Sequence, residues 1–191
     1  EDSLLTGALE PTNLPYAIAK IAGTVMCDAY RKQFGFNAFT VMPSNVYGVG
    51  DNFDPENSHV VAGMMRRFHE AKLANSPRVS VWGTGAPKRE LIEADDLADA
   101  CVFLMLNYDD GGIVNVGSSK EVSIRELAHI MAEIIGYKGE VGFDSSRPDG
   151  TPRKIMNNDK IFGMGWSAGT ELPEGLSRMY NWWLENSKTN A

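Results

Sequence analysis

Tyr16-Ala-Ile-Ala-Lys20 is the stretch of this sequence that most restricts the possible folds and reactions. Residues 15–35 are predicted to form a helix, which places the Tyr16 phenol and the Lys20 ammonium one turn apart, with roughly 6 Å between their Cβ atoms. A cation beside a phenol favours the phenolate, so the pair can donate and accept a proton near neutral pH. This chemistry suits the reduction of a carbonyl group. The alternative is an exposed lysine and a half-buried tyrosine on an ordinary amphipathic helix.

The composition is typical of a packed globular domain, with 43% hydrophobic and 23% charged residues. The sequence has no apolar run near the ~20 residues that cross a bilayer and no leader resembling a signal peptide, so we expect a cytoplasmic protein without a membrane partner. The net charge of −7 argues against a nucleic-acid-binding surface. Cys27 and Cys101 show no metal-ligand spacing, so we expect reduced core thiols and no metal site.

Predicted strands alternate with predicted helices, the order expected of a parallel sheet with crossover helices. Strands are predicted at residues 38–42, 79–82, 89–92, 113–116 and 140–143. Further helices are predicted at residues 59–73, at 97–106, from a capping box at 123–126 to about residue 135, and in two C-terminal segments, the last at 173–186. The segments expected to be irregular are an extended turn at 43–48 and a loop at 145–153.

The Gly-rich turn that binds a dinucleotide pyrophosphate is not found, because no Gly-x-Gly-x-x-Gly follows a predicted strand in these 191 residues. The sequence also begins without Met, at Glu1-Asp-Ser-Leu-Leu-Thr6. We therefore expect the C-terminal part of a longer protein, with the main part of a cofactor site outside the chain.

Seven short motifs together resemble the GDP-L-fucose synthase family, a branch of the extended short-chain dehydrogenase/reductases. They are Tyr16-Ala-Ile-Ala-Lys20, Pro43-Ser-Asn-Val-Tyr-Gly48, the segment 51–59 ending in Asn-Ser-His59, Val81-Trp-Gly-Thr-Gly85 with Arg89-Glu90, Asp95-Asp-Leu-Ala98, Asn115-Val-Gly117 and Pro148-Asp-Gly-Thr-Pro-Arg-Lys154. The resemblance implies an α/β fold, namely an incomplete Rossmann-type parallel sheet with a small α/β substrate domain. It also implies an oxidoreductase and epimerase that converts GDP-4-keto-6-deoxy-mannose to GDP-L-fucose with NADPH, and a homodimer.

The same resemblance divides the chain into four segments. Residues 1–48 would be a remnant of the dinucleotide-binding domain, 49–88 a substrate-binding segment, 89–117 a return to the dinucleotide-binding domain and 118–191 the C-terminal substrate-binding domain. The isolated chain is expected to be inactive, because it would lack about half of the parallel sheet.

Catalytic and cofactor-binding roles follow from the matched positions. Tyr16 would protonate the keto oxygen as hydride arrives, and Lys20 would hold the nicotinamide ribose and keep the phenol acidic. His59 matches the second acid-base group of the epimerisation, and imidazole suits this role because both of its protonation states are accessible at neutral pH. The residues expected to contact NADPH are Lys20, Pro43, Asn45, Val46 and His59.

Substrate-binding roles are implied for five further residues. Arg67 and Arg89 would hold the GDP diphosphate, since a guanidinium fork pairs well with phosphate oxygens. Trp82 would cover a base or sugar face, although a Trp at a strand end is often a core residue. Asp149 and Lys154 lie in the nucleotide-binding loop, where the carboxylate could accept hydrogen bonds from guanine.

The sequence departs from the family at Glu93, where relatives usually carry His. Neither cysteine matches the epimerase Cys of the family. Two other functions stay open at this stage: another nucleotide-sugar epimerase or dehydratase on the same scaffold, and a non-catalytic protein that binds a nucleotide sugar.

Overall fold

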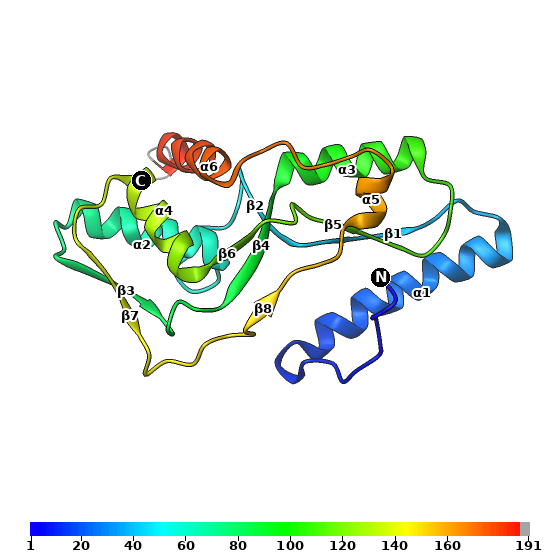
Figure 1. The fold of residues 1–191 in the computed structure, drawn as a ribbon, viewed down its shortest axis with the longest axis horizontal. Helices are drawn as coiled ribbons and strands as arrows, with labels where there is room; N and C mark the ends of the chain where they lie inside the picture. The colour runs from blue at the N-terminus through cyan, green and yellow to red at the C-terminus, as the bar shows by residue number, and fades with distance from the viewer. Residues whose placement is uncertain (188–191) are drawn as a thin grey trace.

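Short, mostly parallel strand pairs form the centre of the computed structural model, which describes residues 1–187 (Figure 1). The parallel pairs are β1 (Thr40–Pro43) with β5 (Ile113–Val116), β2 (Asn45–Tyr47) with β4 (Lys88–Glu93), β3 (Arg78–Trp82) with β7 (Glu140–Asp144), and β4 with β8 (Arg153–Lys154). Among the strands of residues 1–187, only β6 (Glu121–Ser123) is antiparallel to its neighbour, β4. The predicted α/β class with a parallel sheet is confirmed.

Helices connect and cover these strands. In chain order they are the 3₁₀ turn η1 (Pro11–Asn13), α1 (Leu14–Phe34), α2 (Val60–Leu73), α3 (Ala94–Asn107), α4 (Ile124–Ile135), α5 (Asp159–Gly163) and α6 (Leu172–Ser187). Within residues 1–187 none of these helices has the length and apolar character needed to span a membrane.

Two hydrophobic cores lie at opposite ends of the molecule. The larger one is built by α2, α4 and α6 over β3 and β7, around fully buried Phe68, Met131 and Met179. The smaller one is built by α3 and α5 against β1 and β5, around Leu104 and Val114. Figure 1 shows β4 running between these two ends, so residues on β4 can reach both parts.

Local sequence signals explain where several helices begin and end. The Ser123 hydroxyl accepts a hydrogen bond from the Glu126 N–H, while the Glu126 carboxylate accepts one from the Ser123 N–H, which confirms the predicted capping box of α4. Gly35 ends α1 and Gly136 ends α4, both in the left-handed conformation that glycine adopts without strain. The predicted start of α1 at residue 15 and its end at Gly35 agree with the structure within one residue.

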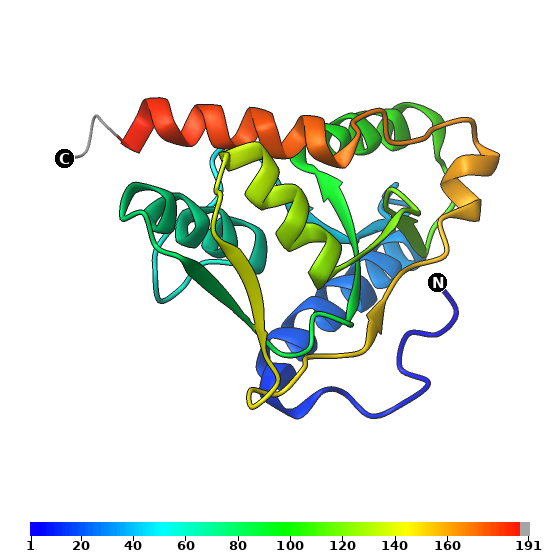
Figure 2. The same ribbon diagram turned by 60° about the vertical axis from the view of Figure 1, so that its left-hand side comes forward.

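α1 lies apart from both cores, near the N-terminal segment (Figures 1 and 2). Thr24 is its only buried residue, and the helix exposes apolar side chains along its length: Ile18, Val25, Met26, Tyr30 and Phe34. A soluble helix normally buries such a stripe. In the described part of the chain α1 therefore presents an uncovered apolar surface.

The structure corrects some expectations. Residues 43–48 are not only a turn, because β2 forms there and transfers the chain from β5 to a new partner, β4. The two-to-three-residue strands β6 and β8 were not predicted, since segments so short carry no alternation pattern. Cys27 and Cys101 are free thiols, as expected, but both are half-buried and not core residues.

Candidate functional site

The Tyr16 and Lys20 side chains share one face of α1, as the spacing predicts. Lys20 Nζ lies 5.5 Å from the centroid of the Tyr16 ring. Tyr16 is 60% exposed, so its phenol is open to a ligand and is not a core group. The tyrosine is therefore exposed and not half-buried, whereas its role in proton transfer stays a prediction.

A cleft of about 640 Å³ opens between α1, the end of β1, the start of β2 and the start of α2. All the residues predicted to meet the cofactor line it together with Tyr16: Lys20, Pro43, Asn45, Val46 and His59. They come together because β1 ends at Pro43 and the chain crosses to β2, and ligands of open parallel sheets bind at the carboxyl ends of the strands. We call this the α1 cleft.

The wall of the α1 cleft also holds residues that the sequence did not single out. Ser44 Oγ is buried there without a hydrogen-bond partner in residues 1–187, and Thr24 lines the same wall. An unpaired buried hydroxyl costs stability unless a ligand or water satisfies it. Together with the Lys20 ammonium and the Asn45 amide, this hydroxyl gives the cleft several polar groups that could bind a ligand.

His59 is the N-cap residue of α2, with an extended backbone and no capping hydrogen bond from its side chain. The side chain is 84% exposed, and its Nδ1 lies 3.9 Å from Asp51 Oδ1. Asp51 was not predicted as a site residue, although it belongs to the motif that ends in His59. The two side chains lie close enough for an electrostatic interaction when the imidazole is protonated.

A second cleft of about 380 Å³ lies on the other side of His59. It gathers four of the five residues predicted to bind substrate: Arg67, Trp82, Arg89 and Asp149. Because these residues come from α2, β3, β4 and the loop before β8, only the fold brings them together. We call this the α2 cleft.

Trp82 and Arg67 are presented to solvent in the α2 cleft. The Trp82 indole is 64% exposed, so it is not a core residue, and the Arg147 guanidinium lies 5.2 Å from its ring. One guanidinium nitrogen of Arg67 donates to the Ser80 carbonyl at 3.3 Å, which leaves its other donors available. The basic and aromatic groups therefore face the same space.

Arg89 and Asp149 make contacts within the protein that the sequence could not show. Arg89 donates from one nitrogen to the carbonyls of Lys88 and Thr151, each at 2.7 Å. Both carboxylate oxygens of Asp149 accept hydrogen bonds from Thr84. The predicted contact between Asp149 and guanine stays a prediction.

Lys154 lies beside Arg89 in the β4–β8 pair but is not among the residues that line either cleft. The two clefts thus gather ten of the eleven residues that the sequence singled out and leave this lysine outside.

Glu93, the departure from the family pattern, has a structural role. It is 2% exposed, its carboxylate accepts a hydrogen bond from the Asp95 N–H at 2.6 Å, and it lies 3.6 Å from the Arg178 guanidinium. The carboxylate caps α3 and connects it with α6, so an acidic residue is accommodated at this strand end.

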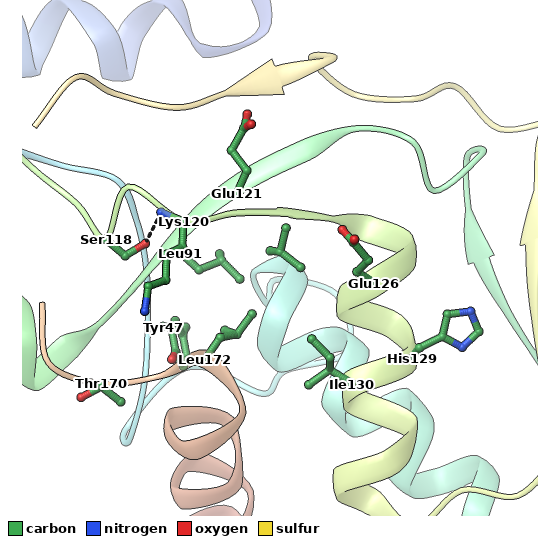
Figure 3. Close-up of a pocket in the computed structure, with 11 residues that line it drawn as sticks. Tyr47, Leu91, Ser118, Lys120, Glu121, Glu126, His129, Ile130, Thr170 and Leu172 are labelled. Carbon is green, nitrogen blue, oxygen red and sulfur yellow. Dashed lines mark hydrogen bonds between the residues drawn. The ribbon is translucent and has the colours of Figure 1, made fainter.

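A third cavity, of about 490 Å³, lies between β4, β6, α4 and the start of α6 (Figure 3). Its lining includes Tyr47, Leu91, Val122, Ile130 and Leu172, and Figure 3 shows the polar chains of Lys120 and Glu126 on opposite sides of it. Burial raises the pKa of the Tyr47 phenol well above its ordinary value, with further contributions from Glu93 and Asp96. The residues predicted for catalysis, cofactor or substrate do not line this cavity.

Comparison with known proteins identifies the family. Residues 1–117, more than half of the chain, match the NAD dependent epimerase/dehydratase family. The chain belongs to this family. The predicted resemblance to GDP-L-fucose synthases is also confirmed: the chain is 56% identical to "Probable GDP-L-fucose synthase 1" of Oryza sativa subsp. japonica and 47% identical to the GDP-L-fucose synthase of Escherichia coli (strain K12).

These alignments include 97% of this chain but only 57% of the rice protein and 61% of the E. coli protein. Among solved structures, a GDP-L-fucose synthetase from Naegleria fowleri bound to NADP superimposes with a TM-score of 0.91 at 27% identity, covering 98% of this chain and 61% of that one. This member of the NAD dependent epimerase/dehydratase family therefore spans about three-fifths of the length of the relatives it matches.

Proposed function

We propose that this chain carries the proton-transfer and nucleotide-sugar-binding groups of a GDP-L-fucose synthase, which epimerises and reduces GDP-4-keto-6-deoxy-mannose to GDP-L-fucose with NADPH. The observation that carries the proposal is the position of His59, which lines both the α1 cleft and the α2 cleft. A sugar ring between the clefts would have Tyr16 on one side and the arginines on the other.

The α1 cleft supports the chemical part of the proposal. Bound NADPH supplies hydride to the keto carbon, and Lys20, Pro43, Asn45 and Val46 are the residues that would hold its nicotinamide end. The Tyr16 phenol then gives its proton to the alkoxide that forms, and the Lys20 ammonium stabilises the phenolate left behind.

His59 would serve the epimerisation. An imidazole can remove a proton from a carbon next to the keto group, or return one to it, because its two protonation states are both accessible near neutral pH. The carboxylate of Asp51 lies 3.9 Å from the imidazole, where its negative charge attracts the ring once it has taken up a proton.

The α2 cleft supports the nucleotide part. Arg67 and Arg89 offer guanidinium donors to the diphosphate, and the exposed Trp82 indole offers an apolar face to the base or sugar. Asp149 forms part of the cleft wall, where an oxygen lone pair remains for a guanine donor.

The same proposal includes a homodimer formed through α1 and a cytoplasmic location. A groove of about 450 Å³ lined only by apolar residues, among them Ile18, Val25 and Met26, runs along α1 and the N-terminal segment. A second copy would cover this surface. Analytical ultracentrifugation of the unsubstituted chain should show dimers, and Val25→Asp should shift it toward monomers. If both proteins sediment only as monomers, the dimer is wrong.

Within the proposal, residues 1–48 and 89–117 belong to the dinucleotide-binding domain and residues 49–88 and 118–191 hold the nucleotide sugar. Residues 188–191 of the last segment lie outside the described residues. The alternative function is that of a related epimerase or dehydratase acting on another nucleotide sugar, because a UDP-glucose 4-epimerase from Thermotoga maritima shares the fold, with a TM-score of 0.77 at 24% identity.

Two measurements test the proposal. Calorimetry on the chain should give tighter binding of GDP than of UDP. For turnover, the chain replaces the matching region of the E. coli GDP-L-fucose synthase, and this hybrid enzyme should oxidise NADPH when GDP-4-keto-6-deoxy-mannose is added. Activity with a UDP-sugar and none with the GDP-sugar would favour the alternative. GDP binding by the chain, combined with a folded but inactive hybrid enzyme, would favour a non-catalytic binding protein.

A further inference from the structure

One wall of the α2 cleft is a loop, residues 145–152, between β7 and β8. Asp149 and Gly150 of this loop line the cleft. Backbone hydrogen bonds hold the two ends: the Gly83 N–H donates to the Asp144 carbonyl before the loop, and the Lys88 N–H donates to the Pro152 carbonyl at its end, both at 2.9 Å. These two bonds do not fix the part of the loop around Asp149, which is held by a side-chain contact.

Thr84 is that anchor. Its backbone N–H donates to Asp149 Oδ1 at 2.8 Å, and its hydroxyl donates to Asp149 Oδ2 at 2.7 Å. Both donors of one residue thus bind both oxygens of one carboxylate, and hydrogen bonds to a charged group are stronger than those between neutral groups.

The turn that carries Thr84 is shaped for this contact. Gly83 and Gly85 both have positive φ, at 82° and 78°. A Cβ on Gly83 would overlap Asp149 Oδ1, so only glycine allows the carboxylate to approach the turn. The Thr84 hydroxyl also accepts a hydrogen bond from the Ala86 N–H at 3.1 Å, which fixes the direction of the hydroxyl proton.

The anchored loop meets two of the residues that face the ligand. Arg147 places its guanidinium over the exposed Trp82 ring, and the Thr151 carbonyl accepts a hydrogen bond from Arg89. If Asp149 were released, the whole loop would therefore become more mobile. The contact between Arg147 and the Trp82 ring and the hydrogen bond from Arg89 to the Thr151 carbonyl would both weaken.

We propose that Thr84 is a positioning residue of the nucleotide site: it fixes Asp149, and through it the 145–152 loop, as the preformed wall of the α2 cleft. The inference rests on the proposed function, since it takes a guanosine diphosphate group as the occupant of the cleft. A preformed wall raises affinity because less conformational entropy is lost on binding.

The test is a set of variants whose affinity for GDP is measured by calorimetry at one salt concentration. Thr84→Val keeps the size and β-branching of the side chain and removes the hydroxyl donor, and we expect GDP binding about tenfold weaker. Thr84→Ser keeps both donors and should bind within about twofold of the unsubstituted chain. Thr170→Val, a threonine on the lining of the third cavity, is the matched control and should leave the affinity unchanged.

A double-mutant cycle separates anchoring of Asp149 from stiffening of the turn through Ala86. If Thr84 acts through Asp149, Thr84→Val added to Asp149→Ala should cause little further loss, whereas independent effects would add. Amide exchange in residues 145–152 should also rise in Thr84→Val. Unchanged GDP affinity in Thr84→Val, or additive losses in the cycle, would overturn the inference. An unsubstituted chain that fails to bind GDP would instead overturn the proposed function.

Discussion

Lys20 Nζ lies 5.5 Å from the centroid of the Tyr16 ring, and both groups open into the cleft that His59 also lines. A phenol so placed can act as the proton donor of a reduction, while the nearby cation stabilises the phenolate that results. In the hybrid enzyme, Tyr16→Phe should lower kcat by about 10² to 10⁴-fold, the usual contribution of a general acid.

The affinity for GDP should be unchanged in Tyr16→Phe, because Tyr16 does not line the α2 cleft. Tyr30→Phe removes an exposed phenol from the same helix and serves as the control. A Tyr16→Phe hybrid with normal kcat would exclude the phenol as the acid.

His59 should be needed for the epimerisation more than for the reduction. Replacement by Gln keeps a polar side chain at the start of α2 but removes the group that can take up and release a proton. With the His59→Gln hybrid, we expect much slower incorporation of solvent deuterium into the sugar carbons, measured by mass spectrometry, with NADPH still able to bind. Deuterium incorporation at the normal rate would show that another group exchanges these protons.

Arg67 and its neighbour Arg66 offer a matched comparison. Arg67 lines the α2 cleft, whereas the Arg66 guanidinium is paired with Glu70 at 2.6 Å and donates to the Phe53 carbonyl. Lysine keeps the charge but loses the bidentate fork. Arg67→Lys should therefore weaken GDP binding about tenfold, or ~1.4 kcal/mol, and Arg66→Lys by less than about twofold. Equal losses in the two variants would show that the position of Arg67 in the α2 cleft is not what matters, and unchanged affinity in both would show that positive charge alone is enough.

The sequence predicted the residues of both clefts better than it predicted their contacts. Tyr16 and Lys20 were placed correctly because helical spacing is a local property, and motif matching found His59 and Arg67. It could not show that Thr84 holds Asp149, since this contact joins residues 65 positions apart. The turn predicted at residues 43–48 contains β2, which the sequence does not indicate, because β2 pairs with residues of β4 46 positions further along the chain and a three-residue strand has no periodic pattern.

Glu90 should be important for stability rather than for ligand binding. Its side chain is buried, at 1% exposure, and its carboxylate accepts hydrogen bonds at 2.8 Å from the Ser119 and Met156 N–H groups and from the Asn158 amide. Glu90→Gln replaces one acceptor oxygen with a donor and should lower the free energy of unfolding by about 2 kcal/mol or more. Urea denaturation measures the change, with the exposed Glu185→Gln as the control. Equal stability of the two variants would contradict this role.

His69 should make the packing of α6 on α2 sensitive to pH. Its Nδ1 lies 2.9 Å from the Tyr180 hydroxyl, and its ring packs edge-on against Trp183. Burial lowers the pKa of His69 below its ordinary value, the Lys72 charge adds to this effect and Glu70 opposes it.

Because the folded state holds this imidazole neutral, the unfolded chain takes up the proton first as the pH falls. Stability should therefore be fully present above pH ~6.5, the unfolded pKa, and decrease as the pH falls through and below it. Thermal unfolding followed between pH ~7.5 and ~5.5 should show a decline that is smaller in His69→Gln, whereas the exposed His129→Gln should keep the slope of the unsubstituted chain. The same slope in His69→Gln as in the unsubstituted chain would assign the pH dependence to other groups.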